Sequence, residues 1–173
     1  MPLNPNASEL ISRKGNKKIF IETGTANGDG VQCAIDAGFE KIYSIELNPV
    51  LFERCKIRFK DNKNITLICG SSEQKLPEVL EKIEEPFILW LDAHWSGGEY
   101  IGELMDVYLP KELNAIKKYF EKFNNSVLMI DDMNHYLSNK NFCDQIEKTV
   151  NEIKRTGTLS YCEAYHSTHL VKI

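Results

Sequence analysis

Acidic residues close most of the short apolar runs of this chain. Four of the five runs end in carboxylates, which are Glu22, Glu46, Asp92 and the adjacent pair Asp131 and Asp132. Carboxylates held close together in a poorly solvated cleft are costly unless a cation or hydroxyl donors lie between them. Each acid taken alone is equally well explained as the start of a following helix, where negative charge is favourable. The set as a whole favours a ligand site.

The loop after the first run, from Glu22 to Asp29, contains two glycines. Gly24 allows a sharp turn, and Gly28 allows the backbone to approach a ligand, with free N–H groups of the next helix available to an anionic group. The loop does not match the dinucleotide fingerprint G-x-G-x-x-G, and Asp29 in the first helical turn would repel a phosphate. Glu46 suits another task, which is to accept hydrogen bonds from ribose hydroxyls. A nicotinamide cofactor is therefore disfavoured.

Short apolar runs alternate with segments of helical spacing along most of the chain. The expected strands cover residues 18–22, 41–46, 65–69, 87–91 and 127–130. Asn48 followed by Pro49 predicts the start of one helix, and Pro110 predicts the start of another. Because a helix lies between successive strands, the strands must run parallel, and right-handed crossovers place helices on both faces of the sheet.

Two extended runs, 158–164 and 168–173, flank a short turn at the end of the sequence and predict a hairpin. The expected fold is therefore α/β, with a doubly wound, mostly parallel seven-stranded sheet and a C-terminal antiparallel hairpin. Ligands bind such sheets at the carboxyl ends of the strands, where the acidic residues lie.

The composition is typical of one folded domain. The 173 residues are 42% hydrophobic and 27% charged, which excludes a disordered or fibrous chain. The net charge of −4 argues against a protein that coats nucleic acid or an anionic membrane, and no apolar run is long enough to span a bilayer. The five cysteines are scattered, as expected in a reducing compartment. We expect a single cytoplasmic domain over 1–173, with 1–16 as a lead-in segment and no nucleic-acid or membrane partner.

Three segments resemble the first motifs of Rossmann-like S-adenosylmethionine-dependent methyltransferases. They are the runs from Ile21 to Gly28, from Ser44 to Glu46 and from Gly70 to Ser72. Asp92 and the pair Asp131 and Asp132 resemble the metal ligands of the divalent-cation-dependent O-methyltransferases of the catechol, caffeoyl-CoA and macrocin type. The resemblance extends from Lys17 to the end of the chain and implies a Rossmann-like methyltransferase fold.

The resemblance also implies how the cofactor would lie. Glu22 and Gly24 would line its methionine end, and Glu46 would hold the ribose. Ser72 and Glu73 would lie at the adenine edge, with His94 or Trp95 packed on the ring. The complete cofactor-binding set comprises Glu22, Gly24, Thr25, Asn27, Gly28, Glu46, Ser71, Ser72, Glu73, Asp92, His94 and Trp95.

The sequence departs from this family in two respects. The N-terminal helices that cover the site in many such enzymes are absent or reduced to the residues before Lys17. The lysine that often follows the metal-binding aspartate has no counterpart, because Ala93, His94 and Trp95 stand there. The resemblance therefore does not identify the general base or the cover of the site.

The implied chemistry is methyl transfer to an oxygen atom. The enzyme must align donor and acceptor, and coordination of the acceptor hydroxyl to Mg²⁺ would lower its pKa. Asp92, Asp131 and Asp132 supply the oxygen ligands that Mg²⁺ prefers, although the last two could instead form a capping turn before a helix near residue 139. The candidate catalytic residues are Asp92, His94 and His135. Either histidine could act as the base, but His94 could instead pack beside the cofactor, and His135 could be an ordinary loop residue.

The leading hypothesis is thus S-adenosylmethionine-dependent, Mg²⁺-assisted O-methylation of a small-molecule hydroxyl. A second hypothesis keeps the cofactor without the metal, with a histidine as sole base and a nitrogen or macromolecular acceptor. A third is a non-catalytic nucleotide-binding module, which the short N-terminal segment favours. A homo-oligomer in which a neighbouring subunit covers the site is compatible with all three.

Overall fold

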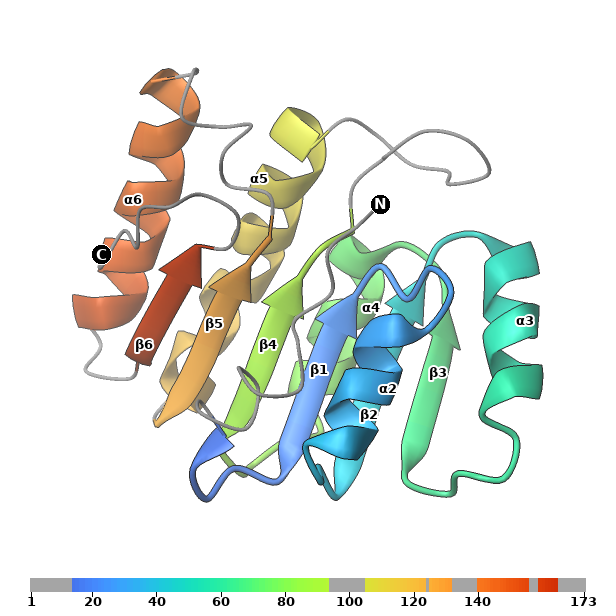
Figure 1. The fold of residues 1–173 in the computed structure, drawn as a ribbon. Coiled ribbons are helices and arrows are strands. Elements are labelled where there is room, and N and C mark those ends of the chain that lie inside the picture. The colour runs from blue at the N-terminus through green and yellow to red at the C-terminus, as the bar shows by residue number, and fades with distance from the viewer. Residues whose placement is uncertain (1–13, 94–104, 124, 132–139, 156–158, 165–173) are drawn as a thin grey trace.

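The computed structural model describes residues 14–93, 105–123, 125–131, 140–155 and 159–164. In chain order the elements are β1 (Ile19–Thr23), α2 (Asp29–Asp36), β2 (Lys41–Glu46), α3 (Pro49–Arg58), β3 (Ile65–Cys69), α4 (Ser72–Leu80), β4 (Phe87–Leu91), α5 (Met105–Ile116), the 3₁₀ helix η1 (Lys117–Phe123), β5 (Ser126–Ile130), α6 (Lys140–Arg155) and β6 (Leu159–Ala164). Helices and strands alternate as the sequence predicts (Figure 1).

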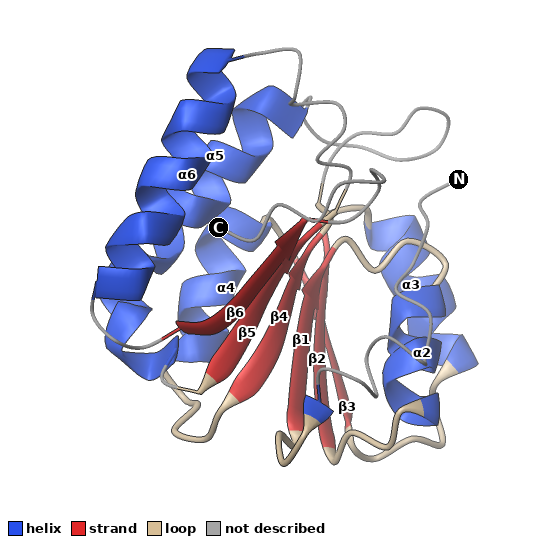
Figure 2. Ribbon diagram, turned by 60° about the vertical axis from the view of Figure 1, so that its left-hand side comes forward, coloured by secondary structure: helices blue, strands red, loops and turns tan. Residues whose placement is uncertain are grey.

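The strands form one sheet in the order β3-β2-β1-β4-β5-β6, and every neighbouring pair is parallel. The chain winds outward from β1 to β3, returns to β4 beside β1, and then winds outward in the other direction. Figure 2 shows the result, with α2 and α3 on one face of the sheet and α4, α5 and α6 on the other. The predicted doubly wound α/β sheet is confirmed.

Three details of the prediction are wrong. The described residues contain six strands rather than seven, and they show no C-terminal hairpin. The run predicted as its first strand forms β6, which lies parallel to β5 because α6 carries the chain back to the opposite end of the sheet. Residues 168–173 lie outside the described part. The other error concerns Pro110, which lies inside α5 rather than at its start.

Each face of the sheet has its own apolar core, because successive side chains of a strand point to opposite faces. One core packs Leu89, Leu128 and Leu113 under α4 and α5. The other packs Phe20 and Trp90 with residues of α2 and α3. All five residues of β4 are buried, as expected for a central parallel strand covered on both sides.

The helix starts show how local sequence fixes the connections. The Asn48 side chain accepts a hydrogen bond from the Val50 N–H at 2.9 Å, and Pro49 occupies the first helical position of α3, as predicted. No described helix is both long and apolar enough to cross a membrane.

Candidate functional site

Four strand ends meet at one edge of the sheet. Thr23 of β1 is in register with Ile45 of β2 on one side and with Leu91 of β4 on the other. For each strand, the next residue along the chain lies at this edge. These residues are Glu46 at the end of β2, Gly24 after β1, Asp92 after β4 and Asp131 after β5. Neighbouring strands lie about 4.8 Å apart. The structure therefore brings three of the predicted acids to one edge, with Gly24 between Glu46 and Asp92.

At Gly24 the loop after β1 lies against the backbone of Asp92. The Gly24 backbone is left-handed, with a φ of 83°, and a Cβ atom there would overlap the carbonyl oxygen of Asp92. The Gly24 N–H donates to the Ile45 carbonyl at 2.9 Å, which holds the turn against β2. Only glycine lets the chain leave β1 so close to the backbone that follows β4.

The carboxylate of Glu46 organises the loop after β1. Its Oε2 accepts from the Ala26 N–H at 2.8 Å, and its Oε1 accepts from the Asn48 N–H at 2.7 Å. Burial raises the pKa of Glu46, and these backbone hydrogen bonds oppose that rise. A carboxylate has about four acceptor positions, and the backbone N–H groups of Ala26, Leu47 and Asn48 use three of them, which leaves one position for a ligand hydroxyl.

Glu22 lies inside β1 and is buried below the edge, whereas the sequence predicts it at the edge. Its Oε1 accepts from the Ser44 hydroxyl at 2.6 Å, and Ser44 is hydrogen-bonded in turn to the Thr25 hydroxyl. The side chain is 2% exposed and faces α2, where a Cβ atom at Gly30 would overlap its Oε2. Burial raises the pKa of Glu22 to about 8, with a smaller contribution from the negative charges of Glu46 and Asp29. Glu22 is therefore mostly protonated at neutral pH and supports the loop from below.

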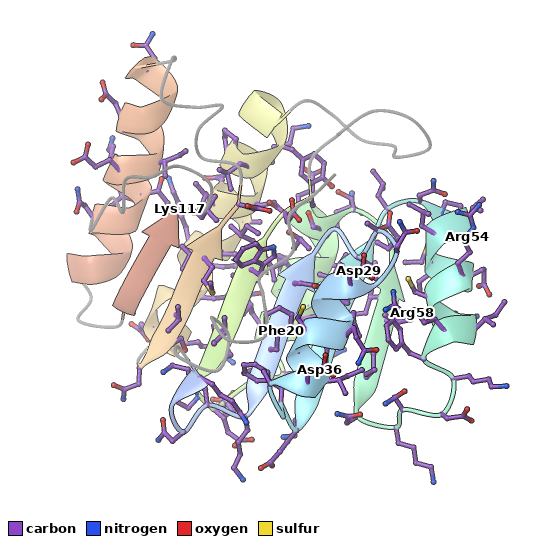
Figure 3. The ribbon with its side chains drawn as sticks, viewed as in Figure 1. Phe20, Asp29, Asp36, Arg54, Arg58 and Lys117 are labelled. Atoms are coloured by element: carbon purple, nitrogen blue, oxygen red, sulfur yellow. The ribbon has the colours of Figure 1, made fainter. Side chains whose placement is uncertain are left out.

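The start of α2 carries an ion pair with α3. Asp29, in its first turn, accepts from the Arg58 guanidinium of α3 at 2.8 Å, and Figure 3 shows both side chains on these two helices. Arg58 also donates to the Asn27 carbonyl at 2.5 Å. At Gly28 the close approach is to the Phe59 ring, which a Cβ atom would overlap. This helix start is thus held by an ion pair and carries a negative side chain where a phosphate would need positive charge.

Asp92 and Asp131 form the acidic pair at the ends of β4 and β5. The Asp131 N–H donates to the Leu91 carbonyl at 3.0 Å, so the two strands stay paired up to the edge. Asp92 is 9% exposed and Asp131 is fully buried, and each has a buried carboxylate oxygen. Their oxygens are of the type that Mg²⁺ prefers, but the described residues contain no group of three acidic, histidine or cysteine side chains that could hold a metal. The third predicted ligand, Asp132, lies outside them.

A second polar cluster lies on the opposite face of the sheet, under α4 and α5. The Ser72 hydroxyl donates to Glu112 Oε1 at 2.5 Å, and the Ser71 hydroxyl is hydrogen-bonded to the Tyr108 hydroxyl at 2.9 Å. Glu112 is 1% exposed. Glu112 is not among the residues predicted from the sequence, although a signal existed. Glu112 occupies an inward position of the stripe formed by Leu109, Leu113 and Ile116, where an unexplained charged residue indicates a buried polar contact.

The remaining predicted site residues divide into two groups. Thr25, Asn27 and Gly28 lie in the loop after β1, Ser71 lies in the loop after β3, and Ser72 and Glu73 lie in the first turn of α4, all at the same edge as Glu46. His94, Trp95, Asp132 and His135 lie outside the described residues.

Comparisons with known proteins show that this chain is similar in fold to several solved structures. No protein-family model and no curated protein matches the sequence. The SAH-bound methyltransferase PaMTH1 of Podospora anserina superposes with a TM-score of 0.60 at 15% identity, over 87% of this chain and 66% of that one. A thiolation-reductase di-domain from an archaeal non-ribosomal peptide synthetase gives 0.55 at 13% identity, over 91% and 56%. The Bordetella bronchiseptica enzyme WbmH, in complex with NAD⁺, gives 0.52 at 13% identity, over 86% and 55%.

What these proteins share with the chain is a Rossmann-like α/β fold. At such identities the likeness extends to the fold alone, and the chain spans about two thirds or less of each structure. PaMTH1 is bound to SAH and WbmH is in complex with NAD⁺, so the shared fold does not by itself indicate a ligand.

Proposed function

We propose that this protein is an S-adenosylmethionine-dependent methyltransferase. The observation that carries the proposal is the arrangement of Glu46 beside Gly24 at the crossover of the sheet. An acidic residue at the end of the second strand suits the vicinal hydroxyls of a ribose, and Gly24 lets the loop after β1 turn against the backbone of Asp92 without a side chain between them. The fold shared with the SAH-bound methyltransferase PaMTH1 supports the same conclusion.

The start of α2 separates this cofactor from a dinucleotide. A pyrophosphate needs the positive end of that helix, but the carboxylate of Asp29 lies there, paired with Arg58. S-adenosylmethionine carries no phosphate and has a positively charged sulfur. An acidic edge with a carboxylate in the first turn of α2 therefore favours the sulfonium nucleoside over NAD⁺.

In the proposed complex a ribose hydroxyl donates to Glu46, and the adenine lies over Ser71 and the start of α4. The methionine end lies over Gly24, between the ends of β1 and β4. Glu22 contributes from below, by holding Ser44 and thereby Thr25 in the loop. His94 and Trp95 remain predicted contacts of the adenine ring.

For the acceptor, we propose a small-molecule hydroxyl. Asp92 and Asp131, together with Asp132, would hold Mg²⁺. The bound ion would lower the pKa of an acceptor hydroxyl coordinated to it. The pairing of β4 and β5 up to Leu91 and Asp131 supports this assignment, since it keeps two carboxylates adjacent at the edge. His94 or His135 would take the proton. The alternatives are a metal-independent enzyme with a nitrogen or macromolecular acceptor, and a non-catalytic nucleotide-binding module.

Calorimetric titration with S-adenosylmethionine, S-adenosylhomocysteine and NAD⁺ tests the cofactor. We expect the two sulfur nucleosides to bind and NAD⁺ not to bind. Glu46→Gln should raise the Kd for S-adenosylhomocysteine on the order of ten-fold, because one accepting oxygen is lost. The matched control is Glu53→Gln, since Glu53 is exposed on α3. Binding of NAD⁺ without S-adenosylhomocysteine would refute the proposal.

The metal is tested by the release of S-adenosylhomocysteine across a panel of small alcohols and phenols. We expect Mg²⁺ to stimulate release in the wild type and Asp131→Asn to abolish that stimulation while cofactor affinity stays within about two-fold, a difference below 0.5 kcal/mol. Asp61→Asn, at an exposed position, is the control. Equal activity in excess chelator would remove the metal from the proposal and leave the cofactor in place.

A further inference from the structure

The polar cluster around Glu112 joins three elements that the chain brings together from distant positions. Glu112 belongs to α5, Ser72 to the first turn of α4, and Thr23 to the end of β1. Ser72 and Glu112 are 40 residues apart in the sequence, yet their side chains are hydrogen-bonded at 2.5 Å. Thr23 is hydrogen-bonded to the same carboxyl group.

The hydrogen bonds of this cluster run in one direction. The Asp92 N–H donates to Thr23 Oγ1 at 3.2 Å, which leaves the single proton of the Thr23 hydroxyl for Glu112. Ser72 donates its hydroxyl proton to Glu112 from the other side. The Glu112 carboxyl group thus accepts from Ser72, which follows β3, and from Thr23, which in turn accepts from the Asp92 N–H where β1 meets β4.

Burial makes this arrangement expensive. Glu112 is 1% exposed, and burial raises its pKa to about 7 against the opposing effect of the Ser72 and Thr23 hydrogen bonds. Its neighbours on the inward face of α5, Leu109 and Leu113, are apolar core residues. A leucine at position 112 would continue that face without the desolvation cost, so core packing does not account for a carboxyl group here.

Tyr108, one helical turn before Glu112, contacts the same turn. Its hydroxyl is hydrogen-bonded to the Ser71 hydroxyl and accepts from the Ser72 N–H at 3.3 Å. Tyr108 is 5% exposed. Tyr108 and Glu112, on consecutive turns of α5, therefore bind the hydroxyls of Ser71 and Ser72 and the backbone N–H of Ser72.

We propose that Glu112 is a positioning residue that fixes the turn of Ser71 and Ser72 relative to the junction of Thr23 and Asp92, and so sets the width of the cofactor site before the ligand binds. The inference rests on the proposed function, because it assigns the adenine to the turn after β3 and the methyl donor to the junction. Glu112 would act through Ser72 and Thr23 without touching the cofactor. Preorganisation of this kind raises affinity by lowering the ordering cost of binding.

The first test is hydrogen exchange of the ligand-free protein, which does not depend on the cofactor. Glu112→Gln keeps the side-chain volume but offers one accepting oxygen in place of two. We expect exchange of the Ser72 and Asp92 amides to accelerate on the order of ten-fold, while the amides in the centre of β4 are unchanged. Glu121→Gln, at an exposed position of η1, is the control. Unchanged exchange at both amides, or a uniform acceleration over the whole sheet, would overturn the inference.

The second test is a double-mutant cycle on the Kd for S-adenosylhomocysteine, measured where every variant is folded by circular dichroism. Glu112→Gln and Ser72→Ala should each raise the Kd on the order of ten-fold. The double variant should bind no worse than the single variant with the higher Kd, because both changes break the same hydrogen bond between Ser72 and Glu112. Additive effects, or an unchanged Kd in Glu112→Gln, would refute the positioning role. Failure of the wild type to bind would instead refute the proposed function, and the exchange experiment would still report on Glu112.

Discussion

The buried carboxyl group of Glu22 makes the stability of this protein depend on pH in a predictable direction. Glu22 is protonated in the folded state up to a pKa of about 8, whereas the same group in an unfolded chain loses its proton near 4.5. Between these values the unfolded state releases a proton that the folded state retains. The contribution of Glu22 to stability is therefore complete below pH 4.5 and is lost as the pH rises through 8.

The size of this effect follows from the span of pH. Each pH unit between the two pKa values changes the free energy of unfolding by about 1.4 kcal/mol. From pH 5 to pH 7.5 the wild type should lose about 3 kcal/mol through Glu22 alone. Glutamine is neutral at every pH and can accept from Ser44 in the same way. Glu22→Gln should therefore remove this part of the pH dependence.

Urea unfolding followed by circular dichroism between pH 5 and pH 7.5 measures the effect. We expect the stabilities of Glu22→Gln and wild type to diverge by about 3 kcal/mol over this range, with the variant gaining relative to the wild type as the pH rises. Glu121→Gln, at an exposed position, should follow the wild-type curve. Parallel curves for wild type and Glu22→Gln would show that Glu22 is ionised in the folded state, and the account of its environment would be wrong.

Three further substitutions test other contacts. Gly30→Ala places a Cβ atom on the Glu22 carboxyl and should destabilise the fold by about 3 kcal/mol in urea unfolding; a loss below 0.5 kcal/mol would contradict that packing. Asn48→Ala removes the cap of α3 and should cost about 1 kcal/mol, whereas Asn48→Asp should retain most of the stability; equal losses in both would argue against the cap. Lys122→Met removes hydrogen bonds to the Glu81 and Ile83 carbonyls, each at 3.0 Å, and should lower the free energy of unfolding by about 1 kcal/mol, with no change expected if the amine is solvated instead.

The elements of the fold could be predicted because their signals are local. The strands at 41–46, 65–69 and 87–91 have the predicted bounds, and the start of α3 follows from Asn48 and Pro49. The alternation of helices and strands requires a parallel sheet, which places the ends of β1, β2, β4 and β5 at a common edge. The order of helices and strands along the chain therefore already predicts that Glu46, Asp92 and Asp131 lie at one edge of the sheet.

Other features depended on contacts that no local pattern encodes. The number of strands depended on where the chain goes after α6, and Pro110 lies inside a helix because α5 begins five residues earlier, at Met105. The partner of Asp29 is Arg58, 29 residues further along the chain.

The alternation of strands and helices can be recognised from local sequence, and it correctly predicts that Glu46, Asp92 and Asp131 lie at one edge of the sheet. The tertiary structure decided what each acid does there. Glu22 and Glu46 are both carboxylates near strand ends, but Glu22 faces the closely packed Gly30 of α2 and keeps its proton, whereas Glu46 receives the N–H groups of two loops. The charge state of a buried group depends on the desolvation and donors that distant segments supply, and these exist only once the chain is folded.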